Sequence, residues 1–260
     1  MFFSLSSWVL ALILVAVIVG TTVAGLVAGG HLHRRVDSLR EPFGVLQTAT
    51  LGIVALLLAF GLSLAIGRYE TRRAAVVDDA NTIGTTYLRA QTLAEPVRTR
   101  SLDLLRRYTD EAIRISHEVP GSADMRRTDA AQGVLQRRLW SLAGQALDDA
   151  PVASAPRLYV DSLNEMIDQQ TVRISALNNR VPGTVLLLEV VASALALGLL
   201  ALYLTHLGRG PVTVLVAAVL VTMLLFVTFD LDRPTRGLIT VPDTPLVDLR
   251  ESMALPPAAE

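Results

Sequence analysis

The charged residues in the most unusual surroundings lie at the end of the fourth apolar run. There the sequence FVTFDLDRPTRGL places two carboxylates and two guanidinium groups directly after residues suited to lipid; these are Asp230, Asp232, Arg233 and Arg236. Such groups can pair, and pairing offsets part of the cost of removing them from water. Two aspartates could instead bind a divalent cation, because Ca²⁺ prefers oxygen ligands. No spaced acidic loop accompanies them, so pairing is the interpretation that we favour.

A further carboxylate, Glu189, lies inside an apolar run, six residues beyond Gly183. At ~1.5 Å per residue this is about 9 Å into a helix. An unpaired carboxylate in hydrocarbon costs several kcal/mol, so Glu189 should face other helices or be protonated. We predict an interfacial charge network; its members are Asp230, Asp232, Arg233, Arg236, Arg68, Arg72 and Glu189. The alternative is that Glu189 is an ion or proton site.

Membrane helices would position these groups. The chain has 260 residues, of which 52% are hydrophobic, which is too apolar for one soluble domain of this length. The excess lies in four runs, each long enough for a helix that crosses ~30 Å of hydrocarbon. We expect transmembrane helices at about 8–29, 45–67, 184–204 and 211–229. The fold class is therefore all-α, a polytopic membrane protein with four transmembrane helices.

The runs divide the chain into two transmembrane hairpins, residues 1–67 and 183–229, and two polar segments. The first polar segment, 68–182, has mixed charges and helical periodicity, which predicts a soluble helical bundle. A stripe through Val76, Ala80, Ile83 and Tyr87 indicates that the second transmembrane helix continues into water as one rod. The second polar segment, 230–260, is rich in proline and is expected to form an extended tail.

Three more helices are expected in the bundle, from about Pro96 to the EVPGS turn, at 123–147 and at 156–179. The last has an apolar seam that alternates three and four residues, the spacing of knobs-into-holes packing. Its polar member is Gln170. Either Gln170 lies at a surface edge, or it is buried and fixes the register of the helices.

Small residues recur at every fourth position in two of the apolar runs. They are Ala16, Gly20, Ala24 and Ala28 in the first run, and Ala55, Ala59, Ser63 and Gly67 in the second. Such stripes let helix backbones approach closely in lipid, so we expect both to be packing faces. Beside the second stripe, Leu56, Phe60 and Leu64 also recur every four residues.

Several stretches resemble the bacterial bestrophin-like membrane proteins. The matching motifs are Arg68–Tyr69, Arg72–Arg73, Asp79–Ala80–Asn81 and the closing Asp230-Leu-Asp-Arg-Pro234. The resemblance implies kinship to bestrophins, pentameric anion channels with four membrane helices, a cytosolic helical region and an apolar three-step neck on the second helix. Leu56, Phe60 and Leu64 are then pore-neck candidates; the alternative is that Phe60 fills an ordinary bundle core. The consecutive acidic residues of the bestrophin calcium clasp are reduced here to Asp230 and Asp232.

We therefore predict an ion channel, with anions as the ions that the resemblance implies. It would form a cyclic homo-oligomer, a pentamer by the same resemblance, in the lipid bilayer. The alternative is a membrane-anchored structural or interaction scaffold that presents the helical bundle. The sequence shows no nucleophile–base pair and no cysteine, and its net charge is −1. We therefore expect no enzyme, no cofactor, no metal and no nucleic-acid partner.

The arginine distribution bears on orientation. Near the membrane, seven arginines lie on the side of the bundle and four on the other side. By the positive-inside rule, the bundle and both termini are expected in the cytoplasm and the helices in the cell membrane. The first helix taken alone, with a neutral start and HRR at its end, argues for the reverse orientation.

Overall fold

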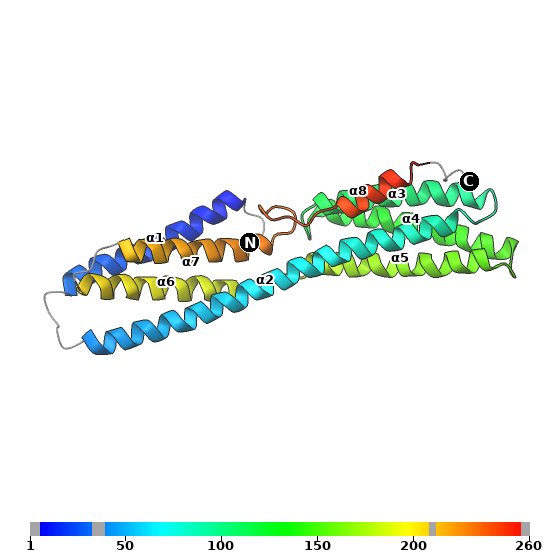
Figure 1. Ribbon diagram of the computed structural model, residues 1–260. Helices are drawn as coiled ribbons and strands as arrows, with labels where there is room; N and C mark the ends of the chain where they lie inside the picture. The colour runs from blue at the N-terminus through cyan, green and yellow to red at the C-terminus, as the bar shows by residue number, and fades with distance from the viewer. Residues whose placement is uncertain (1–5, 33–39, 208–211, 256–260) are drawn as a thin grey trace. The chain divides into compact units, whose positions relative to one another are not determined.

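The computed structural model describes residues 6–32, 40–207 and 212–255, and the regular secondary structure in these ranges is entirely helical. Figure 1 shows the eight helices in chain order. They cluster into two compact units. We call residues 1–68 with 180–239 the membrane unit, and residues 69–179 with 240–260 the bundle unit. The predicted all-α class is confirmed.

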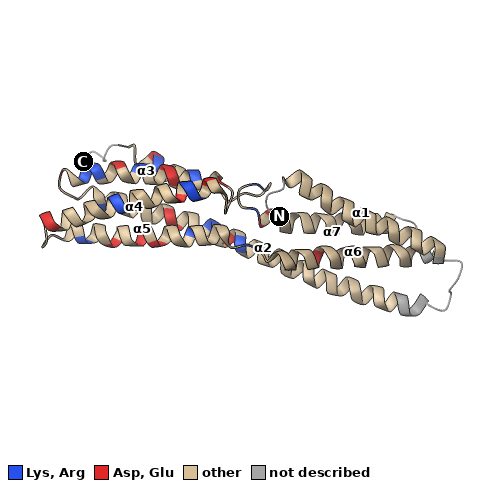
Figure 2. Ribbon diagram, turned by 180° about the vertical axis from the view of Figure 1, so that it is seen from behind, with Lys and Arg blue, Asp and Glu red and all other residues tan. Residues whose placement is uncertain are grey.

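Four apolar helices make up the membrane unit. They are α1 (Ser7–Leu32), the first part of α2 (Arg40–Ala90), α6 (Gly183–His206) and α7 (Val212–Leu231). Each is long and apolar enough to cross a membrane, so the prediction of four such helices is confirmed. Pro211, the expected first residue of the fourth, lies outside the described residues. Figure 2 shows that charged residues are concentrated in the bundle unit and scarce in these helices.

Helix α1 packs closely against α6, and α7 packs against both. The backbones of α1 and α6 approach at Gly25 and Gly29, where an added Cβ would overlap Gly198 and Leu202 of α6. The expected stripe of small residues on α1 does not make this contact, since Gly20 has open space beside it. In the first part of α1, leucine and isoleucine side chains form the buried face of the helix. Gly25 and Gly29 lie on the same face further along.

The bundle unit contains the rest of α2, α3 (Val97–His117), α4 (Ala123–Asp149), α5 (Ser154–Asn178) and α8 (Thr244–Ser252). Helix α2 runs without a break through both units. Its stripe from Val76 to Tyr87 lies in the core of the bundle, with Leu105, Leu139 and Leu163 from α3, α4 and α5. Mixed charges remain on the outside, so this unit has the pattern of a water-soluble helical bundle.

The C-terminal stretch corrects one expectation, because a helix interrupts the tail that we predict to be extended. Pro245 stands in the first turn of α8, where a proline needs no helical N–H partner. Leu246 is fully buried. The Tyr87 hydroxyl of α2 donates to the Met253 carbonyl, 3.0 Å away. Packing on the bundle therefore stabilises a short helix within a tail that is otherwise interrupted by prolines.

Candidate functional site

Helix α2 presents two different faces within the membrane unit. It buries Val54 and Leu58, each at 4% exposure. Leu56, Phe60 and Leu64 lie on another face and are 57%, 61% and 46% exposed. Phe60 therefore does not fill the core of its own chain. An apolar face of this size in a membrane helix contacts lipid, another copy of the chain, or a pore.

A groove of about 420 Å³ lies between α2 and α7 beside this face. It is lined by Leu51, Val54, Ala55, Leu58, Ala59, Leu62, Val221 and Leu224. Ala55 and Ala59 belong to the stripe of small residues that the sequence marks as a packing face. The groove is open to an apolar chain or helix, because its small side chains leave room for close approach.

The two aspartates at the foot of α7 bind backbone amides. Asp230 Oδ2 accepts a hydrogen bond from the Ile239 N–H at 2.8 Å. Asp232 Oδ1 accepts one from the Val181 N–H at 3.0 Å. Both side chains are buried. The first carboxylate ties the following segment back onto α7, and the second ties α7 to the segment that leads into α6.

The neighbouring arginines reach the start of α1 through one hydroxyl. Arg233 Nη1 donates to Ser7 Oγ at 3.2 Å, and Ser7 Oγ donates to the Arg236 carbonyl at 2.9 Å. The stretch after α7 thus contacts the beginnings of both α1 and α6. These contacts give the charged FDLDRPTRGL stretch a structural role as the junction of three helix ends.

The remaining arginines of the predicted network lie on α2. Arg72 lies in the bundle unit and donates to the carbonyls of Ala176 and Asn179, at 3.3 and 2.7 Å. Arg68 is half-buried on α2. The wider network that includes both arginines stays a prediction.

Glu189 lies at a contact between α6 and α2. Its side chain is 1% exposed. A Cβ placed on Gly61 of α2 would overlap the Glu189 carboxyl, so a side chain at this position would require the carboxyl to move. Neither carboxyl oxygen has a hydrogen-bond partner among the described residues. The structure thus places Glu189 in a helix contact without a hydrogen-bonded arginine.

A family model for the bestrophin-like domain matches residues 10–246 of the chain. The chain belongs to the bestrophin-like family. No curated protein matches it. Among solved structures, a bacterial bestrophin homologue from Klebsiella pneumoniae is similar with a TM-score of 0.70 and 13% identity, over 91% of this chain and 96% of that chain.

Other crystal structures agree with this match. A point mutant of the Klebsiella pneumoniae homologue has a TM-score of 0.68 and 16% identity, over 95% of each chain. A structure described only as a membrane protein has a TM-score of 0.69 and 14% identity, over 91% of this chain and 95% of that chain. At these identities the likeness shows the fold, and it extends over both units of the bestrophin-like chain.

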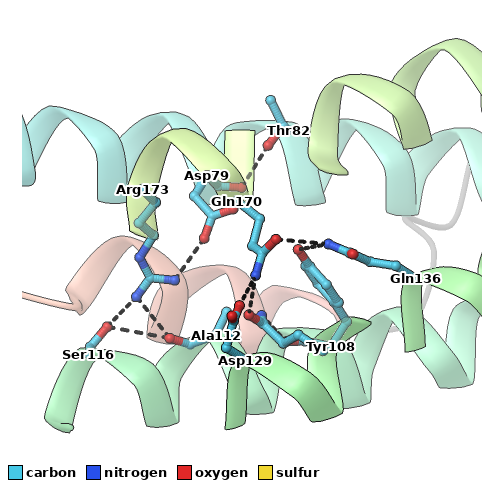
Figure 3. Close-up of polar contacts among 10 residues, drawn as sticks. Asp79, Thr82, Tyr108, Ala112, Ser116, Asp129, Gln136, Gln170 and Arg173 are labelled. Carbon is cyan, nitrogen blue, oxygen red and sulfur yellow. Dashed lines mark hydrogen bonds and ion pairs between the residues drawn. The ribbon is translucent and has the colours of Figure 1, made fainter. Parts of the chain in front are cut away.

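The bundle unit of this bestrophin-like chain contains a buried ion pair that the sequence analysis missed (Figure 3). Arg173 Nη1 lies 2.8 Å from Asp79 Oδ2, and the side chains are 2% and 0% exposed. Arg173 Nη2 also donates to the Ala112 carbonyl at 2.8 Å and to Ser116 Oγ at 2.6 Å. The pair joins α2 to α5, and the further bonds join α5 to α3. In the sequence, the feature that indicates a buried Asp79 is its position among the apolar stripe residues of α2.

Gln170, one turn before Arg173 on α5, is buried, so it does not lie at a surface edge; that it fixes the register of the helices stays a prediction. Its Nε2 donates to Asp129 Oδ1 at 2.6 Å, and its Oε1 accepts from Gln136 Nε2 at 3.1 Å. Gln136 Nε2 also donates to the Tyr108 hydroxyl at 3.3 Å. Burial raises the pKa of Tyr108, so this phenol stays neutral. The polar contacts connect α3, α4 and α5 at one level of the bundle.

Proposed function

We propose that this bestrophin-like chain assembles as a cyclic homo-oligomer, a pentamer, that conducts anions across the cell membrane. The observation that carries the proposal is the exposed face of Leu56, Phe60 and Leu64 on α2. In a ring of identical chains this face would surround the axis. A narrow ring of apolar side chains can gate a pore because water leaves it.

Exposure alone would not distinguish α2, since lipid-facing residues of every membrane helix are exposed. Two further features favour α2. Its apolar residues include an aromatic ring between two leucines at a regular spacing of four. The groove with Ala55 and Ala59 lies next to this face and would receive a helix of the neighbouring copy. A cyclic assembly repeats one such contact between each pair of neighbours.

The charges fit an orientation with the bundle unit and both termini in the cytoplasm. This side carries the larger number of arginines near the membrane, as the positive-inside rule requires. We also propose that the junction formed by Asp230, Asp232 and Arg233 extends to Arg68. Such a network would lock the foot of α7 to the helix that lines the pore. Reporter fusions at the C-terminus and in the HLHRR loop should then give opposite signals.

The decisive assay is anion flux from liposomes that contain the purified chain. The double variant Phe60→Ala/Leu64→Ala should leak more than the wild type, by about tenfold for a barrier lowered by ~1.4 kcal/mol. The matched control is Leu88→Ala, which removes an equally exposed side chain from the bundle part of the same helix. It should leave flux unchanged.

Three outcomes separate the candidate functions. A chain that stays monomeric in mild detergent contradicts the assembly. A double variant that leaks no more than Leu88→Ala contradicts the neck. A stable oligomer that passes neither anions nor cations, with or without the two alanines, favours the scaffold alternative.

A further inference from the structure

Two polar side chains of α6 are buried in the membrane unit. Glu189 is 1% exposed and Ser193 is 0% exposed. Both carboxyl oxygens and the Ser193 hydroxyl oxygen have no hydrogen-bond partner among the described residues. The two residues are four positions apart, so they lie on the same face of the helix. Buried polar groups are nearly always satisfied, and exceptions point to a ligand or a chemical role.

The surface of α2 that faces the Glu189 carboxyl leaves space for it. Gly61 lies against it, and a side chain at this position would overlap both carboxyl oxygens. Gly61 and its neighbours on the buried face of α2 therefore close one side of the Glu189 site. The absence of a side chain leaves room for a carboxyl group and leaves it no donor from α2.

The helices around Glu189 offer few groups that could neutralise a negative charge. At positions 7–31, 44–68, 183–205 and 212–231 of these helices, the titratable or charged side chains besides Glu189 are His31 on α1, Arg68 on α2, Tyr203 on α6 and Asp230 on α7. His31, Arg68 and Asp230 lie at the ends of the apolar runs, and Tyr203 approaches Gly44, far along α2 from Gly61. Asp230 is itself an acid and is already bonded to the Ile239 amide.

We propose that Glu189 is a proton-binding site of the membrane unit, with its carboxyl neutral while α2 and α6 are in contact. An ionised carboxylate that is buried without a counter-charge is strongly unfavourable, and binding a proton removes the charge. The protonated group keeps one O–H donor, and the Ser193 hydroxyl, one turn away on the same face of the helix, is a candidate acceptor. Release of the proton would place a charge between the two helices.

A metal cation fits these residues less well than a proton does. The described side chains supply one carboxylate and one hydroxyl, whereas Ca²⁺ takes about 6–8 oxygen ligands. Backbone carbonyls in the middle of α2 and α6 are occupied by helical hydrogen bonds. A proton needs only one of the oxygens present.

The test is labelling with dicyclohexylcarbodiimide, a lipid-soluble reagent that reacts with protonated carboxyl groups. The full-length wild type in lipid nanodiscs should gain one adduct per chain, which peptide mass spectrometry should locate at Glu189. The adduct should decrease as pH rises, because the ionised group does not react. Glu189→Gln should lose the adduct, whereas Glu165→Gln, which changes an exposed glutamate of the bundle unit, should keep it.

A second measurement does not depend on the variant's folding. The infrared spectrum of the wild type should show the carbonyl stretch of a buried protonated carboxylic acid, and this band should disappear reversibly as pH is raised. Absence of both adduct and band at every pH at which the protein is folded would overturn the proposal. So would an adduct at Glu189 that does not change with pH. Neither readout requires ion flux, so the site and the proposed channel can fail separately.

Discussion

Two buried acids, one in each unit, are neutralised in different ways. Asp79 in the bundle unit meets the guanidinium of Arg173 at 2.8 Å, and both side chains are buried. Glu189 in the membrane unit is equally buried and has no hydrogen-bond partner among the described residues. Burial is therefore not what separates them. The bundle supplies a counter-charge from a facing helix, whereas the apolar runs around Glu189 contain none, which leaves protonation as the way to remove the charge.

The difference follows from how each helix is made. In the bundle every helix carries charges, so an inward arginine can be placed opposite an inward aspartate. In the membrane unit an arginine at the same depth would itself be expensive. There the charged groups gather at the foot of α7, where Asp230 and Asp232 accept hydrogen bonds from backbone amides.

The largest effect is expected when the bundle's ion pair loses one member. Asp79→Ala leaves Arg173 buried without its counter-charge, and breaking such a pair costs about 3–5 kcal/mol. The free energy of unfolding can be followed by the fluorescence of Trp140 on α4, in a chain where Trp8→Phe removes the other tryptophan.

Arg98→Ala is the control for this variant, because the Arg98–Glu95 pair is exposed to solvent. It should lower the free energy of unfolding far less than Asp79→Ala does. Equal losses from the two variants would show that the buried pair is no stronger than a surface pair.

A smaller loss is expected at the foot of α7. Asp232→Ala removes the acceptor of the Val181 amide, and an unsatisfied buried donor costs about 1–3 kcal/mol. The melting temperature of the full chain in detergent should fall. Arg68→Ala extends the test to the proposed network. If both variants express and melt like the wild type, the charges at this junction do not hold the helix ends together.

The smallest effect is expected from Glu189→Gln. Glutamine has nearly the shape of a protonated glutamate, so the free energy of unfolding at neutral pH should change by less than about 1 kcal/mol. This result would sharpen the contrast with Asp79→Ala. A loss as large as that of Asp79→Ala would mean that Glu189 is ionised and paired, and the two acids would then be alike.

The sequence reveals the membrane helices and the anomaly of Glu189, because a single charge in an apolar run is visible without a structure. It does not reveal Gly61 as the neighbour of Glu189, since that depends on which faces of α2 and α6 meet. The Asp79–Arg173 pair is hidden for a different reason. In helices of mixed charge an inward residue looks like a surface one, and only the neighbouring stripe of Val76, Ala80 and Ile83 marks Asp79 as buried.

Two other differences between the sequence-based predictions and the structure have local causes. Ala16, Gly20 and Ala24 of the small-residue stripe on α1 are exposed in this chain because the buried face continues through Gly25 and Gly29. The proline-rich tail forms α8 because Leu246 has a place on the bundle. Periodicity within one segment cannot report either contact, since both depend on a partner from another part of the chain.

Disulfide cross-linking tests most directly whether α2 surrounds the axis of a homo-oligomer. The chain contains no cysteine, so Phe60→Cys introduces one thiol in an otherwise unchanged sequence. In a ring of more than two copies, identical residues approach each other most closely near the axis. The control is Leu215→Cys, at an equally exposed position of α7. We predict that oxidation links Phe60→Cys chains into dimers and leaves Leu215→Cys chains single; cross-linking through Leu215→Cys but not through Phe60→Cys would contradict the account.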